Sequence, residues 1–339
     1  MSSTTTKILN VLRADLIFLY DCIFNVPNGD PFTGEQRIDN ATMRILVSDV
    51  RIKRYIRDYV LMWNLTHPKE DQHNIYLTDV DLRNLEKAGI DTKDISGSSA
   101  QMKNLRLLYK DDPTVRLEGT NGTKGKKQKD DFDVMALILK CLDVRGFGGV
   151  STEKDANIDV TGPIQFRVLN PSLNKVEPLT HQNTSVFKSS VEKEQGAIGT
   201  SSLVPYALCN IVGEISPEVA SKTELTEAEI LFLLKACWHG VNQCRSRSKM
   251  GQCSRLMVKI NYNDLTAKSS KLHKLVKIED PNNTSIRDIE EVKFDFSELL
   301  RHAQKPTVES MQYIVEEEVE KAFLEQMAPV ANKLKRIAL

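Results

Sequence analysis

Basic side chains in this 339-residue chain gather in three short runs. They cover residues 51–57 (RIKRYIR), 124–129 (KGKKQK) and 245–255 (RSRSKMGQCSR), while acidic side chains concentrate at 316–320 (EEEVE). Lys and Arg neutralise backbone phosphates without reading base sequence, so such runs are typical of surfaces that hold nucleic acid. The 46 basic and 46 acidic residues cancel, and any such surface must therefore be local. A solvated face is the alternative for each run, and for 124–129 it is the simpler interpretation.

Cysteine and histidine offer a second kind of chemistry. Four of these residues lie close together in the sequence and could ligate zinc: Cys237, His239, Cys244 and Cys253. Their spacing lacks the short paired form of a zinc finger, so we expect neither a metal site nor a cofactor. No Ser/His/Asp, Cys/His or phosphate-loop arrangement is recognisable. The remaining cysteines are expected in the core: Cys22, Cys141 and Cys209.

Composition narrows the class of protein further. Hydrophobic and charged fractions of 40% and 27% are those of an ordinary globular protein. The longest apolar runs, at 134–139 and 230–234, are far shorter than the ~20 residues that cross a bilayer. The N-terminus lacks the pattern of a secretory signal, so we expect a cytoplasmic protein with reduced cysteines and no membrane contact.

The elements that must position the basic runs can be read from periodicity. Residues 13–26 are β-branched, aromatic and aliphatic, and they end at the turn formers of 27–31, which predicts a strand and a loop. From Ser48 onward, apolar residues recur at helical spacing: Ile52, Ile56, Tyr59, Val60 and Trp63. Three cations occupy an arc outside that stripe, which predicts a basic ridge: Lys53, Arg54 and Arg57.

Further along the chain, the pattern alternates between strands and helices. Residues 64–130 read as a polar insertion, 133–142 as a helix with a glycine-rich exit, and 158–168 as a strand that continues into a polar hairpin. A strand at 203–215 precedes a capping box at 226–229, which opens a helix at 230–239. The strand at 256–262 follows, and the tail from 308 reads as helical until Pro329. This order favours an α+β, ferredoxin-like sheet.

Several short motifs resemble one family. They are Asn28-Gly29-Asp30-Pro31, Arg37-Ile38-Asp39, Ser48-Asp49-Val50 and residues 53–60 (KRYIRDYV). Together they are similar to the signature of the guide-RNA backbone subunits of type I CRISPR Cascade complexes, within the RAMP superfamily and closest to the subtype B and C branches. Here Val26 is inserted into the family's early pattern. The resemblance also covers 143–149, is looser over 161–178, and spans about half of the chain.

The resemblance implies a modified RNA-recognition fold shaped like a hand. The palm would comprise residues 1–63 and 131–305, with a finger-like insertion at 64–130, a thumb hairpin at 167–200 and a helical tail at 306–339. Copies would stack head to tail along guide RNA (crRNA), and each thumb would displace one base of the RNA held by its neighbour. Other Cascade subunits, target DNA and a recruited helicase-nuclease are the further partners implied.

The same resemblance implies a non-catalytic protein whose RNA contacts lie in the basic runs and in the loop after the first strand. Phe147 would stack on a base or anchor its loop, and residues 146–149 would approach RNA or form a tight turn. Two alternatives stay open: a metal-dependent endoribonuclease using Asp30, as in related type III subunits, and a generic single-stranded RNA-binding module. The predicted contacts are Asn28, Gly29, Asp30, Arg37, Ser48, Lys53, Arg54, Arg57, Arg145, Phe147, Gly148, Arg245, Arg247 and Lys249.

Overall fold

A computed structural model describes residues 11–93, 95–117, 132–153, 156–184 and 198–339. The chain divides into two compact units. Unit 1 contains Met1–Val11, Ile56–Gln165 and Ser216–Ala236, and unit 2 contains Leu12–Tyr55, Phe166–Ile215 and Cys237–Leu339. Each unit is described by itself below.

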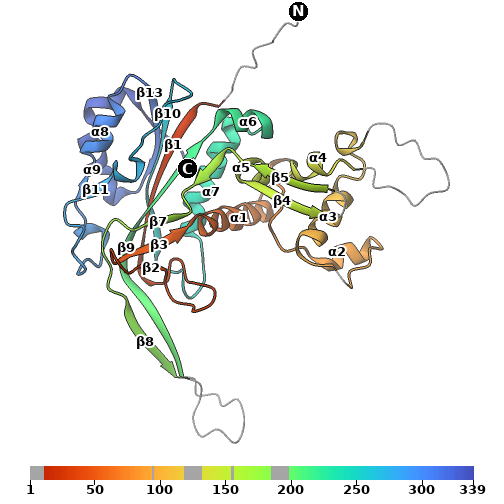
Figure 1. The fold of residues 1–339 in the computed structure, drawn as a ribbon, viewed down its shortest axis with the longest axis horizontal. Helices are drawn as coiled ribbons and strands as arrows, with labels where there is room; N and C mark the ends of the chain where they lie inside the picture. The colour runs from red at the N-terminus through yellow and green to blue at the C-terminus, as the bar shows by residue number, and fades with distance from the viewer. Residues whose placement is uncertain (1–10, 94, 118–131, 154–155, 185–197) are drawn as a thin grey trace, which may run out of the picture. The chain divides into compact units, whose positions relative to one another are not determined.

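The centre of unit 2 is a sheet in which the long strand β1 lies between β9 and β10 (Figure 1). The strand order along its main path is β14-β13-β10-β1-β9-β6, and β8 pairs with β9 beside this path. Strand β1 is antiparallel to both of its neighbours, β9 and β10. The bounds are β1 Arg13–Asn25, β6 Ile164–Phe166, β8 Leu179–Thr184, β9 Ile198–Ile215, β10 Gln252–Tyr262, β13 Val308–Val315 and β14 Leu334–Arg336.

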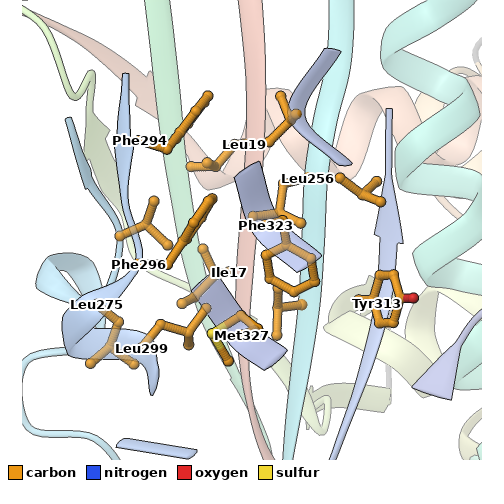
Figure 2. Packing of buried hydrophobic residues seen from close by; sticks show 14 of the residues in the cluster. Ile17, Leu19, Leu256, Leu275, Phe294, Phe296, Leu299, Tyr313, Phe323 and Met327 are labelled. Atoms are coloured by element: carbon orange, nitrogen blue, oxygen red, sulfur yellow. The ribbon is translucent and has the colours of Figure 1, made fainter. Parts of the chain in front are cut away.

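Both faces of β1 are buried, which explains why its sequence is an almost continuous apolar run. On one face, Phe18 lies 6.4 Å from the ring of Trp238, and Tyr20 lies 6.4 Å from the ring of Tyr55. Tyr55 belongs to α1 (Asp49–Thr66) and Trp238 to α7 (Glu227–Asn242). On the other face, Ile17 and Leu19 join an apolar cluster with residues of α8 (Ser297–Ala303) and α9 (Glu317–Met327), as Figure 2 shows.

The sequence predicted α1 and α7 well. The stripe on α1 is buried at Ile52, Ile56 and Val60, as amphipathic spacing requires. At the start of α7, the Thr226 Oγ1 accepts a hydrogen bond from the Glu229 N–H at 3.2 Å, and Glu229 Oε2 accepts one from the Thr226 N–H at 3.0 Å. The predicted capping box is confirmed.

Unit 1 contains a smaller apolar core with helices and a two-stranded sheet. Its elements are α2 Leu82–Lys87, α3 Gly97–Leu108, α4 Val134–Ile138, α5 Leu142–Phe147, β4 Gly148–Glu153, β5 Ala156–Thr161 and α6 Pro217–Thr223. The helix predicted at 133–142 is wrong as a single element. It ends at Ile138 because Cys141 bridges to Asn74 and the Leu142 N–H donates to the Asn74 carbonyl at 2.8 Å, a contact distant in sequence.

Short elements complete the chain. A three-stranded sheet is formed by β2 Ile38–Asp39, β3 Arg44–Ser48 and β7 Leu169–Pro171, and β11 Lys277–Ile278 pairs with β12 Phe294–Asp295. The 3-10 helices are η1 Lys69–Asp71, η2 Pro113–Val115, η3 Leu272–Lys274, η4 Ile289–Glu291 and η5 Ala328–Lys333.

Two predicted segments have different outcomes. In the hairpin predicted at 167–200, β8 pairs with β9 from Leu179↔Leu203 to Thr184↔Ile198, but residues 169–171 pair with β3 instead, and 185–197 lie outside the described residues. The tail predicted as helical at 306–339 begins with strand β13, which continues the central sheet beside β10. Most of its residues are buried, on both faces, as in a strand inside a sheet, and the acidic helix starts only at Glu317.

In the part of the chain that the structure describes, every helix is too short or too polar to cross a membrane.

Candidate nucleic-acid interface

The loop after β1, within unit 2, is closed by the side chain of Asn28. Its Oδ1 accepts a 2.6 Å hydrogen bond from the Ser48 N–H, and its own N–H donates to Gln36 Oε1 at 2.7 Å. Gln36 Nε2 donates in turn to the carbonyls of Arg37 and Leu46. A bridge between Gly29 and Gln36 completes the closure. The motif therefore forms an ordered loop that holds Arg37 and Ser48 beside the start of α1.

Asp30 stabilises the tip of this loop. Its Oδ1 accepts hydrogen bonds from the N–H groups of Phe32 at 2.9 Å and Thr33 at 3.4 Å, and Arg37 approaches its Oδ2 at 3.5 Å. These contacts occupy the carboxylate in a turn, a role that Asp commonly has. The tip presents Phe32, whose side chain is 96% exposed. An aromatic ring held in solvent by an ordered loop is suited to stacking on a base.

The first turns of α1 carry one carboxylate, Asp49, and three cations, Arg51, Lys53 and Arg54. Ser48 Oγ accepts a hydrogen bond from the Arg51 N–H at 3.3 Å, so Ser48 caps the helix. Arg51 lies 5.4 Å over the Tyr55 ring, Lys53 pairs with Asp49 at 3.0 Å, and Arg54 is exposed. The helix dipole also places partial positive charge at this end of α1. The field of the dipole and the field of the cationic side chains therefore add, and together they favour a bound anion here.

The loop between α7 and β10 brings more cations to the same end of β1. The N–H of Val26 donates to the Ser248 carbonyl at 3.2 Å, and Asn25 Nδ2 donates to the Met250 carbonyl at 3.0 Å. Lys249 is buried and its Nζ donates to the Val26 carbonyl. Burial and the nearby Arg51 guanidinium lower the pKa of Lys249 to about 8.

We call Arg51, Arg54, Arg245, Arg247 and Lys249 the α1 basic site. Arg245 and Arg247 are exposed on the loop that holds Lys249. Of this group, sequence reasoning missed only Arg51, although it opens the basic run at 51–57. Sequence reasoning also missed Phe32, although an aromatic residue that directly follows several turn formers could have been noticed.

Arg57 lies in unit 1 and does not belong to the exposed basic ridge that the helical wheel predicted. It is 7% exposed, and its Nε donates to Asp143 Oδ2 at 2.8 Å. Asp143 is fully buried and accepts further hydrogen bonds from the Tyr76 N–H at 2.7 Å and the Leu77 N–H at 3.2 Å. Phe147 is also buried, with the Arg57 guanidinium 5.8 Å from its ring centre. Of the two interpretations of Phe147, the structure favours the anchor.

The remaining predicted residues of unit 1 have packing contacts. Arg145 forms two hydrogen bonds to Glu229, one of them at 3.1 Å. Gly148 has a φ of +87°, and a Cβ there would lie 2.2 Å from the Val160 carbonyl oxygen. A Cβ on Gly146 would lie 2.8 Å from Leu233. The glycine-rich stretch is therefore a tight turn against other protein groups.

Unit 1 contains a basic groove that sequence reasoning did not find. A cavity of about 360 Å³ is lined by Ile90, Lys103, Arg106, Leu107, Lys110, Arg116 and Phe132. The Arg116 guanidinium lies 4.3 Å over the Phe132 ring. The four cations fall at 103, 106, 110 and 116, in α3, in the turn after it and directly after η2, so they never form a run in the sequence.

Among the described residues, no group of three or more His, Cys, Asp or Glu side chains is arranged to hold a metal ion. Cys237, one of the four zinc candidates, is buried, and burial raises the pKa of its thiol. Cys22, Cys141 and Cys209 are buried, as expected for core residues.

Comparison with known proteins identifies the fold of this chain and its family. Two solved structures share the fold at low identity. One, described as a CRISPR RNA-guided surveillance complex, pre-nicking, has a TM-score of 0.54 with 10% identity over 96% of each chain. The other, a CRISPR RNA-guided surveillance complex, has a TM-score of 0.51 with 11% identity over 96% of this chain and 95% of that one. The chain thus has the fold of a subunit of these assemblies.

Sequence comparison gives the family. The profile of the family described as CRISPR-associated protein Cas7 matches residues 12–297. A protein of Haloferax volcanii, CRISPR-associated protein Cas7, is 27% identical over 305 residues, covering 86% of this chain and 83% of that protein. The chain belongs to the Cas7 family, and the family predicted from its motifs is confirmed.

Proposed function

We propose that this protein is a non-catalytic backbone subunit that coats guide RNA in a CRISPR surveillance complex and presents it for pairing with target DNA. The observation that carries the proposal is the α1 basic site, where cations, a helix N-terminus and the ordered Asn28 loop meet. These groups bind phosphate rather than bases, which suits a subunit that must accept any guide sequence.

The topology supports a modified RNA-recognition palm. Along the chain, β1, α1, β6, β9, α7 and β10 follow the βαββαβ order of ferredoxin-like folds, and their sheet order is β10-β1-β9-β6. Strands β13 and β14 extend this sheet at the β10 edge. Because α8 and α9 cover the face opposite α1 and α7, we infer that RNA follows the loops at the strand ends. The β8–β9 pair is our candidate for the thumb.

We further propose head-to-tail stacking of copies. The chain has zero net charge but separates its charges, with cations at the α1 basic site and carboxylates at the start of α9. Complementary faces on one chain favour a heterologous contact that repeats along a filament. Other Cascade subunits and a helicase-nuclease would join the assembled complex, in the cytoplasm.

The direct test is to express the chain with its neighbouring genes, purify it and sequence the RNA that copurifies. We expect uniform RNA derived from a CRISPR repeat array. Random RNA would favour a generic single-stranded RNA-binding module instead. The endoribonuclease alternative would use Asp30, whose carboxylate is engaged in its own turn.

Target DNA is the partner we assign to the basic groove of unit 1. We expect Lys103→Glu/Lys110→Glu to weaken target DNA binding by the RNA-loaded complex at least about tenfold, since phosphate contacts dominate such affinity. RNA content should stay unchanged. Lys69→Glu/Lys87→Glu, the same charge change on exposed lysines of unit 1 outside the groove, is the matched control for an electrophoretic mobility assay. An equal loss of DNA binding in both variants would contradict a specific role of the groove.

RNA affinity should depend on pH through Lys249. With a pKa of about 8 in the free protein, this amine loses its charge as pH rises from 7 to 9, and affinity for oligoadenylate should fall about tenfold. The effect of the same titration on folding stability has the opposite sign. The pKa of Lys249 in the folded protein lies below its ordinary value of 10.5, so the unfolded chain binds the proton more tightly. The free energy of unfolding therefore rises as the pH increases above 8 and the buried amine loses its charge. Unfolding therefore cannot mimic the loss. Fluorescence anisotropy measures the affinity for oligoadenylate at each pH. The Lys249→Met variant should bind the RNA weakly at every pH between 7 and 9. If its affinity fell with pH as steeply as that of the wild type, Lys249 would not be the titrating group.

A further inference from the structure

Unit 2 contains a cavity whose lining includes none of the residues of the α1 basic site. It has a volume of about 510 Å³, and its lining residues come from β3 and the turn before it, from β7 and the chain after it, from β9 and from residues 273–281. That volume is typical of small-molecule sites, which span ~300–1,000 Å³. Much of the wall is apolar, formed by Leu173, Val276, Ile278 and Pro281. This cavity is therefore large enough and apolar enough to hold a flat organic group.

The charge of this cavity is one-sided. Arg44, Lys274 and Lys277 line it, and the lining includes no carboxylate, although Lys277 pairs at 3.6 Å with Glu298, which lies outside the lining. Arg44 is partly buried, and its Nη1 donates to the carbonyls of Ser172, at 2.5 Å, and Leu173. Within the described residues it pairs with no carboxylate, and burial lowers its pKa without an acidic group to oppose the shift. A partly buried guanidinium without a counter-ion is an unsatisfied charge that an anionic ligand would balance.

Other buried arginines of unit 2 show the contrast. Arg13 pairs with Glu214, and Arg255 pairs with Asp21 at 2.9 Å and with Glu318 at 3.2 Å. Both of these arginines have a carboxylate partner, which Arg44 lacks among the described residues.

A buried amide adds a hydrogen-bond acceptor to the same wall. Asn210 lines the cavity, and its Nδ2 donates to the His273 carbonyl at 3.1 Å, which fixes the orientation of the amide. Its Oδ1 is buried and accepts no hydrogen bond from the described residues. A ligand that carries an N–H group would satisfy this oxygen.

We propose that this cavity binds a nucleotide, with the base against the apolar wall and Asn210, and the phosphate at Arg44 and Lys274. Every nucleobase combines flat apolar faces with N–H donors, and its phosphate supplies the missing anion. Inorganic phosphate would leave the apolar wall uncovered, and an acidic peptide would need a longer groove. The nucleotide is either free or part of bound RNA; only the second source rests on the proposed function.

The first experiment measures mononucleotide binding to the purified protein by equilibrium dialysis with radiolabelled AMP, UMP and inorganic phosphate. We expect both nucleotides to bind more tightly than phosphate, and Lys274→Glu to weaken them at least about tenfold, as the loss of a charge-assisted contact does. Lys271→Glu, the same charge change at an exposed lysine outside the lining, should stay within about twofold. Thr42→Trp should prevent nucleotide binding, because Thr42 lines the cavity and a larger side chain there would fill part of it. Equal affinity for phosphate and nucleotides would overturn the base-binding part.

The second experiment locates the source of the nucleotide. RNA containing 4-thiouridine is assembled with the protein, irradiated and mapped by mass spectrometry. Crosslinks to residues 171–176 or 271–281 that Lys274→Glu removes, with RNA content unchanged, would assign the cavity to the bound strand. Mononucleotide binding without such crosslinks would assign it to a free nucleotide.

Two results would overturn the proposal. The first is the absence of both nucleotide binding and crosslinks. The second is that an amine-reactive crosslinker joins Lys274 to a second copy while nucleotides fail to bind, which would make the cavity a contact between copies. If the wild-type protein retains no RNA, the proposed function fails, whereas the dialysis experiment still decides the cavity.

Discussion

Arg54→Ala/Arg245→Ala/Arg247→Ala should remove guide RNA from the purified protein while leaving the fold intact. All three side chains are exposed, so their removal opens no cavity. A charge-assisted hydrogen bond contributes about 1.5–3 kcal/mol, and three lost phosphate contacts should therefore weaken RNA binding at least about 100-fold. The slope of log affinity against log salt should also fall by about 2, since each contact to a single strand contributes about 0.7.

The matched control is Lys268→Ala/Lys321→Ala/Lys335→Ala, which removes three exposed cations of unit 2 from outside the α1 basic site. Filter binding across a salt series would compare the two variants with the wild type. If the arginine variant kept its RNA and the wild-type salt slope, the α1 basic site would not be the RNA surface. Arg57 is left out of this variant because its contacts belong to the core of unit 1.

Asp143→Ala should destabilise unit 1 by about 3–5 kcal/mol, because it leaves the Arg57 charge buried without a partner. It would also strand the N–H groups of Tyr76 and Leu77, which donate to the same carboxylate. Urea unfolding followed by circular dichroism gives the change in free energy, and hydrogen exchange at residues 74–78 locates it.

Asp81→Ala is the control, since its ion pair with Arg83 is exposed and it caps only the short helix α2. We expect this variant to be destabilised much less than Asp143→Ala. A similarly small effect of Asp143→Ala would mean that the buried ion pair does not stabilise unit 1.

Local signals explain what the sequence could predict. The apolar stripe of α1 and the Thr226–Glu229 capping box are encoded within a few residues, and both are confirmed. The burial of Arg57 could not be predicted in this way, because its partner Asp143 lies 86 residues away. Lys249 is similar: its partner, the Val26 carbonyl, lies 223 residues before it.

The tail shows a different limit. Val308–Val315 forms a strand although its sequence lacks a regular alternation of apolar and polar residues, and the acidic helix that follows dominated the sequence pattern. The pairing with β10 fixes this segment as a strand of the central sheet. Pairing between segments that are distant in the sequence leaves no local pattern from which it could be predicted. The basic groove of unit 1 was missed because its cations meet in space and not in sequence.

The ends of the central sheet bear on aggregation. Its main path of strands finishes at β14 on one side and β6 on the other, and each of these strands is three residues long; β8, which pairs with β9 beside this path, has six. Short edge strands give another chain little backbone to pair with, and natural proteins use them to avoid uncontrolled sheet growth. The head-to-tail stacking proposed above would bring copies to a high local concentration, where this protection matters. Copies could then associate through side-chain surfaces, which can be reversible, without extending the sheet from these two edges.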